Sequence, residues 1–284
     1  MKIEANAKIN LSLSVTGKLS DGYHTIETVM QSVDLHDTLT VSVNNTGKIN
    51  VLTDSEELNK EINIAAIAAE LFLAEVKSEL GVDIFIQKRI PQAAGLGGGS
   101  ADAAAVIKAL NRIFNNPLDN AQLVKLALNV GADVPFCLDG GTCLATGKGE
   151  KLQSVCQMPQ CSIVLVKNTV KGSTGQMYQK IDEIRTQHRF DISETVRALK
   201  SIELLKSALH NDFRSVCDCS EIIGAERVMA QSGAECFSLS GAGPVVFGIF
   251  NDPEKAQLCV DRFRSGGDWA EVCHPCNHAN LIIE

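Results

Sequence analysis

The chain has 284 residues, of which 45% are hydrophobic, so it is long and apolar enough to bury the cores of two domains of ordinary size. Its 26 Lys and Arg against 34 Asp and Glu give a formal net charge of −8. This balance argues against a nucleic-acid backbone or an anionic membrane as the main partner, so any contact with phosphate must be local.

Neither a secretory signal nor a membrane span is predicted. The N-terminal stretch "MKIEANAKINLSLSV" interrupts its apolar residues with polar and charged ones. The most apolar helical stretch, "NIAAIAAELFLAEV", carries Glu70 and Glu75 and falls short of the roughly 18 apolar residues that a spanning helix needs. The ten cysteines of a chain without a signal are expected to be reduced. These features predict a cytoplasmic protein.

Strands and then helices are predicted in the first half of the chain. From Lys8 the sequence "KINLSLSV" alternates strictly, which predicts a strand with Lys8 and Asn10 on the same face. Further strands are predicted at 37–43, 47–53 and 82–88, and a helix at 61–79. Apolar residues at helical spacing predict that another helix begins after Ser100, and "NAQLVKLALNVG" predicts a helix that ends at Gly131.

Beyond about residue 160 the order of the predicted elements changes. Apart from extra helices, it is β-α-β-β-α-β, the order of a ferredoxin-like unit. We therefore predict two domains, 1–155 and 156–284. The predicted strands lie at 162–167, 236–240, 245–250 and 269–273, and the predicted helices at 174–186, 191–209, 220–232 and 253–265.

The stretch "PQAAGLGGGSADAAAV", residues 91–106, is a glycine loop that leads into a helix. It lacks the Lys-Ser/Thr pair of a P-loop and the third glycine of a dinucleotide fingerprint. Glycines nevertheless let backbone N–H groups converge on an anion, and a helix start adds its positive end. Ser100 is a candidate to cap that helix or to offer its hydroxyl to a phosphate-bound cation. The alternative is a tight strand-to-helix connection without a ligand.

Three other stretches have both a structural and a chemical interpretation. Asp133 in "GADVPF" precedes Val134 and Pro135, where we expect extended chain, and is either a turn residue or a catalytic carboxylate. Lys8 is either an exposed strand lysine or the partner of that carboxylate. The turn in "SLSGAGPVVFGIF" either joins two strands or, through Gly241 and Gly243, approaches a ligand site.

A C-terminal CxxC, formed by Cys273 and Cys276, has His274 and His278 close by in the sequence. Such residues bind zinc when a second pair completes the site. No second cysteine pair at matching spacing is present. The favoured interpretation is therefore a surface turn near the C-terminus.

Taken together, these stretches resemble the GHMP family of small-molecule kinases over nearly the whole chain. "PQAAGLGGGSADAA" is similar to the family's P-x-x-x-G-L-G-S-S-A phosphate loop, with Gly99 where many members have Ser. "SGAGPVVFGIF" is similar to the C-terminal glycine motif that braces this loop. The resemblance implies an α+β, two-domain GHMP kinase fold. Its N-terminal domain is ribosomal-protein-S5-like and binds ATP, and its C-terminal domain is ferredoxin-like and lies on the substrate side.

The resemblance also implies ATP and Mg²⁺ as cofactors and a set of residues that hold them. "NINIAAIAAEL" is similar to the adenosine-side helix of the family, which makes Asn63 a candidate near the adenine, although Ile67 stands where a basic residue is common. Ser100 is the candidate for contact with Mg²⁺. The implied cofactor-binding residues are Asn63, Lys88, Pro91, Gly95, Leu96, Gly97, Gly98, Gly99, Ser100, Ala101 and Asp102.

The N-terminal "AKINLSLSVTGKLSDGYHTIETVMQSVDLHDTL" implies a substrate class. Its A-K-I-N-L and D-G-Y-H are similar to those of family members that phosphorylate cytidine-diphosphate-linked methylerythritol in the non-mevalonate isoprenoid pathway. In such an enzyme Asp133 is the base, Lys8 is its charge partner and Asn10 lies near the phosphoryl acceptor.

The same resemblance assigns the cytosine contacts. It implies that Tyr23 stacks on the base, that His24 hydrogen-bonds to the edge of the base and that Tyr178 in "STGQMY" forms the second stacking face. The alternative for Tyr178 is a core position, because Met177, Ile181 and Ile184 form an apolar stripe beside it. Two rival functions remain, a kinase of another small alcohol such as homoserine or mevalonate, and a nucleotide sensor without transferase activity.

Overall fold

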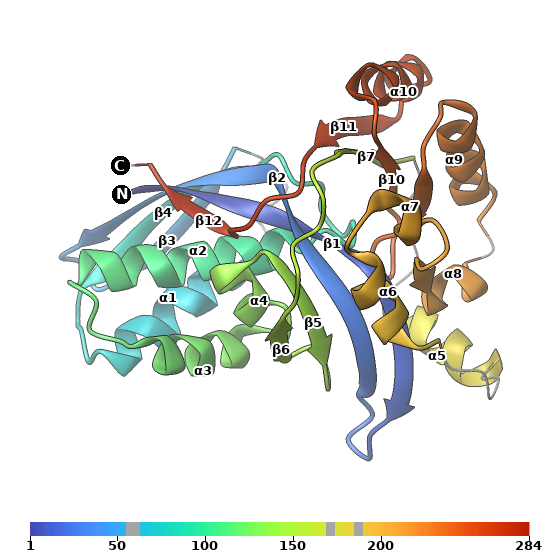
Figure 1. Ribbon diagram of the computed structural model, residues 1–284. Helices are drawn as coiled ribbons and strands as arrows, with labels where there is room; N and C mark the ends of the chain where they lie inside the picture. The colour runs from blue at the N-terminus through green and yellow to red at the C-terminus, as the bar shows by residue number, and fades with distance from the viewer. Residues whose placement is uncertain (55–62, 169–173, 185–189, 218, 284) are drawn as a thin grey trace.

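The described residues form two sheets, of eight and four strands, and Figure 1 shows their arrangement. The computed structural model describes residues 1–54, 63–168, 174–184, 190–217 and 219–283. The N- and C-termini lie side by side at one end of the larger sheet (Figure 1). The combination of helices with two largely antiparallel sheets confirms the predicted α+β fold.

The larger sheet is dominated by two long antiparallel strands, β1 (Lys2–Lys18) and β2 (His24–Asn44). Both exceed the strands predicted from Lys8 and at 37–43. In β1 the apolar alternation continues back to Ile3, whereas in β2 the buried polar residues Thr28, Gln31 and Ser32 hide the apolar pattern. The main path of the sheet runs β12-β1-β2-β4-β3, and β5, β6 and β8 pair off this path. The remaining strands are β3 (Ile49–Thr53), β4 (Gly81–Gln87), β5 (Thr142–Thr146), β6 (Lys151–Ser154), β8 (His210–Asn211) and β12 (Asn280–Ile282).

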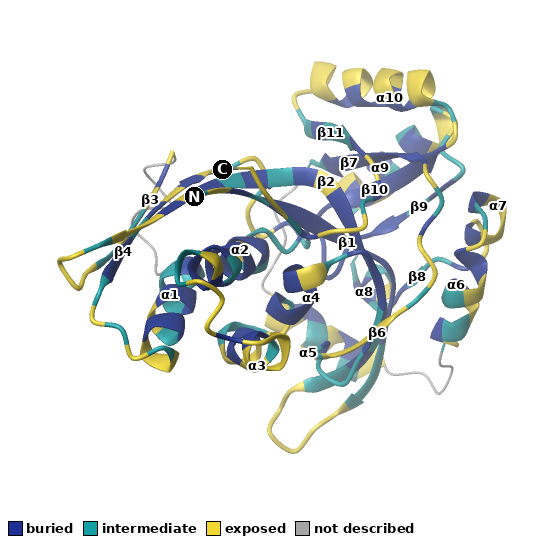
Figure 2. Ribbon diagram, turned by 60° about the vertical axis from the view of Figure 1, so that its left-hand side comes forward, coloured by how far each residue is buried: buried dark blue, intermediate teal, exposed yellow. Residues whose placement is uncertain are grey.

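Four helices lie on one side of this sheet (Figure 1). Helix α2 is the central one, and Figure 2 shows that most of its length is buried. Asp119 caps α3 with a capping box, and α3 ends before Gly131 as predicted. Residues 61–62 of the predicted first helix lie outside the described residues. The helices are α1 (Ile64–Glu75), α2 (Gly98–Ile113), α3 (Asn120–Val130) and α4 (Val134–Asp139).

Two local predictions in this half are wrong. The helix after the glycine loop begins at Gly98 rather than after Ser100, and its N-cap is Gly97 with φ of 71°, so Ser100 is not the cap. The chain at Val134 and Pro135 is helical rather than extended. A proline within the first two helical positions is compatible with a helix, because the N–H groups there have no partner within the helix.

The smaller sheet is antiparallel and its strands lie in the order β11-β7-β10-β9. Along the chain, its elements follow the predicted β-α-β-β-α-β order apart from the extra helices. Alternate residues of β7 face two cores, with Ile163 and Leu165 packed toward the larger sheet and Val164 and Val166 toward α9 and α10. Figure 2 shows the exposed side of α10 facing away from the sheet. The elements are β7 (Ser162–Lys167), β9 (Cys236–Leu239), β10 (Val246–Phe250), β11 (Trp269–Cys273), α9 (Ser220–Gln231) and α10 (Pro253–Ser265).

Extra helices connect β7 to α9. The single helix predicted at 191–209 is divided, because the Ser201 side chain accepts a hydrogen bond from the Leu204 amide and starts a new helix. Residues 185–186 of the helix predicted at 174–186 lie outside the described residues. The helices are α5 (Thr174–Ile184), α6 (Ile192–Ala198), α7 (Ile202–Leu205) and α8 (Asp212–Val216).

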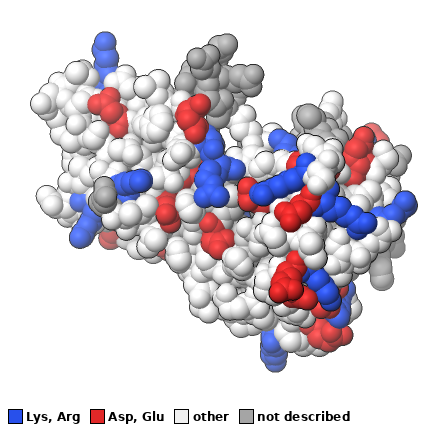
Figure 3. All heavy atoms as spheres, turned by 90° about the horizontal axis from the view of Figure 1, so that it is seen from above, with Lys and Arg blue, Asp and Glu red and all other residues white. Residues whose placement is uncertain are grey.

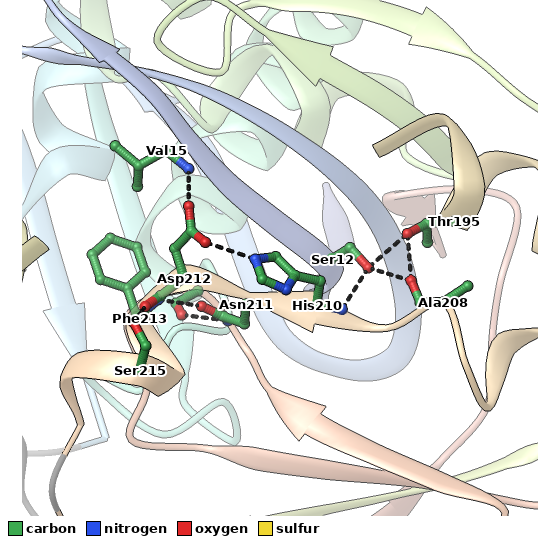
Figure 4. A network of polar contacts seen from close by, with 10 residues as sticks. Ser12, Val15, Thr195, Ala208, His210, Asn211, Asp212, Phe213 and Ser215 are labelled. Carbon is green, nitrogen blue, oxygen red and sulfur yellow. Dashed lines mark hydrogen bonds and ion pairs between the residues drawn. The ribbon is translucent and has the colours of Figure 1, made fainter. Parts of the chain in front are cut away.

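A buried hydroxyl network fastens this connection to β1 (Figure 4). Ser12 Oγ accepts from the His210 amide at 3.0 Å and from Thr195 Oγ1 at 2.8 Å. The His210 ring instead contacts Asp212 Oδ1, at 2.6 Å. Although Ser12, His210 and Asp212 are the residue types of a hydrolytic triad, the serine hydroxyl bonds the histidine backbone, so the network is structural.

We propose the boundary between residues 155 and 156 as the division into two domains, since β6 ends just before it and β7 follows. The C-terminal segment then returns to the first sheet. The Cys276 amide donates to Ser32 O at 2.9 Å, and β12 pairs with β1. The CxxC therefore lies on the segment that crosses between the two sheets. In the described part of the chain, no three His, Cys, Asp or Glu gather as a metal site would require.

The surface seen in Figure 3 carries Lys and Arg interspersed with Asp and Glu rather than one broad area of a single sign. On the face seen in this view, the described residues therefore do not form the continuous basic stripe that is typical of polyanion-binding surfaces. In addition, among the helices of the described residues, none is both long and apolar enough to cross a membrane.

Candidate active site

Two cavities meet at the glycine loop. The first has a volume of about 420 Å³ and is lined by the loop, the start of α2 and Asn63 of the α1 N-terminus. The second, about 730 Å³, is lined by residues from β1, the β1–β2 turn and α5. Gly95 and Ser100 line both cavities, so a group in one lies next to a group in the other.

Close packing around the glycine loop accounts for two of its glycines. Gly95 has φ of +79°, and a Cβ there would lie 2.1 Å from the carbonyl oxygen of Ser240. Gly97 has φ of +71°, and a Cβ there would lie 2.9 Å from Lys8 Cγ. Ser240 Oγ donates to Gly95 O at 2.9 Å, so the second glycine turn contacts the first.

Gly95→Ala is expected to destabilise the protein by roughly 1–3 kcal/mol, because the left-handed backbone is strained with a side chain and the Ser240 carbonyl must move. Urea unfolding measures the loss. The control is Gly224→Ala in α9, where nothing lies within 4 Å and alanine favours the helix by about 0.5–1 kcal/mol. Equal stability of Gly95→Ala and the parent protein would contradict this account of the loop.

The start of α2 is suited to an anion. The first α2 amide with a helical acceptor is that of Ala101, which donates to Gly97 O at 2.8 Å. The amides before it are the unpaired donors that every helix start presents, and no acidic residue lies in the first turn. Leu96 and Ala101 are buried and support the loop, whereas Pro91, Gly98 and Gly99 line the first cavity.

Lys8 and Asp133 meet at the edge of the second cavity. Lys8 Nζ lies 3.3 Å from Asp133 Oδ2, although the two residues come from β1 and from the N-cap of α4. The Lys8 side chain is 6% exposed and that of Asp133 is 34% exposed. The exposed-lysine interpretation of Lys8 is therefore wrong, because β1 carries it between the glycine loop at Gly97 and the start of α4.

A chain of hydrogen bonds orients the lysine. Lys8 Nζ donates to Asn10 Oδ1 at 2.8 Å, and Asn10 Nδ2 donates to Thr28 Oγ1 at 2.9 Å. The Asn10 amide also donates to Ser240 Oγ at 3.3 Å. The Asp133 carboxylate makes no capping hydrogen bond to α4, so its oxygens remain directed to Lys8 and the cavity.

Lys88 lies between two buried carboxylates behind the glycine loop. Its Nζ bonds to Asp37 Oδ2 and, at 2.7 Å, to Asp102 Oδ2. Burial opposes the charge of Lys88, but attraction to Asp102 and Asp37 outweighs it and raises the Lys88 pKa. Burial and the Asp37 charge raise the pKa of Asp102 despite Lys88. Asp102 Oδ1 is buried without a hydrogen-bond partner among the described atoms.

The three predicted base-binding residues line the second cavity. The His24 and Tyr178 rings stack with centroids 4.4 Å apart and planes 15° apart, so His24 covers part of one Tyr178 face. Tyr178 lies beside the buried stripe of Met177 and Ile181 rather than within it. Tyr23 is 63% exposed, and Lys148 Nζ lies 4.1 Å from the centroid of its ring.

Sequence reasoning missed several residues that shape the site. Asp182 contacts His24, Lys148 contacts Tyr23, and the Phe213 ring meets Tyr178 edge-on at 4.9 Å. Only Asp182 had a sequence signal, because it follows Tyr178 by four residues on a helix and so lies on the same face. The other contacts join segments far apart in the chain.

Family models match both halves of the chain. The model of the GHMP kinases N terminal domain matches residues 63–141, and that of the GHMP kinases C terminal matches residues 195–268. The first range includes the glycine loop and Asp133, and the second includes the turn that contacts the loop.

Named relatives match nearly the full length. The chain is 40% identical to a 4-diphosphocytidyl-2-C-methyl-D-erythritol kinase of Acetivibrio thermocellus, over 95% of this chain and 96% of the relative. It is 38% identical to the protein of the same name from Caldicellulosiruptor bescii, over 93% and 94% of the two chains.

Solved structures show the same fold. A crystal structure of 4-(cytidine 5'-diphospho)-2C-methyl-D-erythritol kinase matches with a TM-score of 0.81 and 30% identity, over 96% of this chain and 99% of the other. A homoserine kinase from Cytophaga hutchinsonii matches with a TM-score of 0.76 at 19% identity, over 100% of this chain and 97% of the other, which concerns the fold alone.

Proposed function

The chain belongs to the GHMP kinase family, and on that premise we propose that it transfers the γ-phosphoryl group of ATP to the 2-hydroxyl of 4-diphosphocytidyl-2-C-methyl-D-erythritol, a step of non-mevalonate isoprenoid synthesis. The observation that carries the proposal is the Lys8–Asp133 pair, 3.3 Å apart, where the glycine-lined cavity meets the aromatic-lined one. The names of the similar full-length relatives support the substrate.

The nucleotide is assigned to the glycine-lined cavity. The amides at the α2 start and the glycine loop bind its phosphates, while Asn63 lies on the side proposed for the adenosine. Lys88 is engaged by two carboxylates, so its proposed contribution is to hold Asp102 and the β4 end in place behind the loop. Most of the rate arises from positioning, because phosphoryl transfer leaves little covalent work for the protein.

Asp133 is the proposed base. Its partly exposed carboxylate faces the second, aromatic-lined cavity, which we call the acceptor cavity. The carboxylate takes the proton of the substrate hydroxyl as the new bond to phosphorus forms. Lys8, held by Asn10, places a positive charge where negative charge gathers on the transferred group and on the attacking oxygen. The pair therefore combines proton removal and charge stabilisation at one point.

Ser100 is the proposed protein contact for Mg²⁺. The site fits this ion because Ser100, which carries a hydroxyl, lines both cavities. Mg²⁺ in kinase sites is held by few protein oxygens together with phosphates and waters. When bound, the ion neutralises phosphate charge during the transfer. Ser100→Ala tests this assignment through the Mg²⁺ concentration needed for half-maximal turnover.

The experiment that tests the function is ADP release by the purified protein with ATP and Mg²⁺. We expect turnover with 4-diphosphocytidyl-2-C-methyl-D-erythritol and not with homoserine or mevalonate, because Tyr23, His24 and Tyr178 line the acceptor cavity. Turnover only with another alcohol would support kinase activity but contradict the proposed cytosine pocket. Absence of turnover with all three would favour a nucleotide sensor.

A further inference from the structure

A small cluster built from β1, β2 and α5 borders the acceptor cavity through Lys18, His24 and Tyr178. His24 begins β2, and its register partner on β1 is Lys18. Tyr178 and Asp182 lie four residues apart on α5, so both face the hairpin formed by β1 and β2. The cluster thus joins the turn that carries Tyr23 to the helix that carries Tyr178.

The His24 ring is held on two sides. Its face stacks on Tyr178, with the ring centroids 4.4 Å apart. Its Nε2 lies 2.9 Å from Asp182 Oδ1, and the side chain is 7% exposed. A ring fixed at its face and at one nitrogen has little freedom to turn, so its other nitrogen, Nδ1, keeps one direction.

Asp182 acts on this ring as an acceptor. Its Oδ2 receives a hydrogen bond from Lys18 Nζ at 2.6 Å. The hydrogen bonds from Lys18 and then from His24 hold the pKa of Asp182 below its ordinary value. An ionised carboxylate only accepts hydrogen bonds, so the proton of the neutral imidazole resides on Nε2.

The opposite nitrogen is then left as an acceptor. In a neutral imidazole with its proton on Nε2, Nδ1 carries a lone pair. In the described part of the chain, Nδ1 is without a hydrogen-bonding partner, and His24 lines the acceptor cavity. A ligand edge that offers an N–H to Nδ1 completes the site, whereas an edge that offers an oxygen places two lone pairs against each other.

We propose that Asp182 is a positioning residue that fixes the Nε2–H tautomer of His24 and thereby selects cytosine, which carries an amino donor, over uracil, which carries a carbonyl acceptor at the same position. This inference rests on the proposed function. It adds to that function the group that sets the polarity of the base edge. Lys18 completes the arrangement by engaging the second oxygen of Asp182.

The first test is spectroscopic and needs no activity. In the ¹⁵N-labelled protein, a long-range ¹H–¹⁵N spectrum distinguishes the tautomers of each histidine, and the His24 signals are assigned by their loss in His24→Gln. We expect the neutral His24 ring of the parent to carry its proton on Nε2 and none on Nδ1. A proton on Nδ1 would overturn the inference.

The second test measures base selection. We compare kcat/KM for the cytidine diphosphate substrate and for its uridine analogue in the parent protein and in Asp182→Ala. The ratio is expected to fall by about tenfold to a hundredfold in the variant, the size expected when one hydrogen-bonding group in a binding site no longer discriminates between a donor and an acceptor. The matched control is Glu183→Ala, the exposed neighbour on α5, which removes the same charge and is expected to keep the parent ratio.

The outcomes separate the inference from the function. Absence of turnover with both pyrimidine compounds would overturn the proposed function and the base selection that rests on it. Turnover of the cytidine compound with an equal ratio in the parent and in Asp182→Ala would overturn the inference alone. If Asp182→Ala does not fold, the same comparison in Asp182→Asn, together with its His24 spectrum, decides whether ratio and tautomer change together.

Discussion

Asp133→Asn is expected to lower turnover by roughly a thousandfold, within the range of about 10²–10⁴ that a positioned general base contributes. The amide has the shape of the carboxylate, and its oxygen still accepts from Lys8 Nζ, which lies 3.3 Å from Oδ2 in the parent. It has no basic oxygen to take the proton of the substrate hydroxyl. Substrate binding, measured directly by calorimetry, is therefore expected to change little while single-turnover chemistry slows.

The control for this variant is Asp139→Asn at the other end of α4. Asp139 is exposed, pairs with Lys108 at 3.4 Å and does not line the acceptor cavity. Its substitution changes the same charge on the same helix and is expected to leave turnover within about twofold of the parent. Parent-like turnover in a folded Asp133→Asn protein would remove Asp133 from the role of base.

The glycine loop was predictable from the sequence because its signal is local. Glycine density before a helical pattern needs only neighbouring residues to be interpreted, and the structure places that loop at the start of α2. The ferredoxin-like order was predictable for the same reason, since each short strand is flanked by turns and by a periodic helix. The exact helix start was not, because Gly97 rather than Ser100 adopts the capping conformation.

The contacts that complete the site depend on distant segments. Lys8 faces Asp133 across 125 positions of the chain because β1 passes beside α4, and alternation within one strand carries no information about that neighbour. Asp37 is buried by the segment that follows β4, where the Arg89 and Ile90 amides donate to it. Its sequence environment, "LHDTLTV", has the alternation of a strand that is exposed on one face. Such tertiary burial overrides the local pattern.

Asp37 therefore belongs to a buried charge cluster with Lys88 and Asp102, and its place in that cluster was not predicted from the sequence. Lys88→Met is expected to lower the free energy of unfolding. Removal of the amine leaves the carboxylates of Asp37 and Asp102 buried without their cation. Loss of one partner from a buried ion pair costs about 3–5 kcal/mol, and methionine replaces the stem without replacing the charge. Urea unfolding at constant pH measures the loss.

The stability loss of Lys88→Met is expected to depend on pH through the pKa of Asp102. Burial, the first cause, and the Asp37 charge raise the pKa of Asp102 above its ordinary value of 3.8, while Lys88 lowers it. Asp102 therefore keeps its proton in the folded parent up to about pH 8, although the unfolded chain releases it near pH 4, so the parent and Lys88→Met lose stability alike between these pH values. Without Lys88 the proton stays bound to still higher pH, so the deficit of Lys88→Met is expected to be larger at about pH 9.5 than at pH 7. Lys108→Met, which breaks the exposed pair with Asp139, is expected to stay within about 0.5 kcal/mol of the parent at both pH values. A deficit that is the same at pH 7 and at about pH 9.5 would mean that Lys88 stabilises the loop by packing rather than by charge.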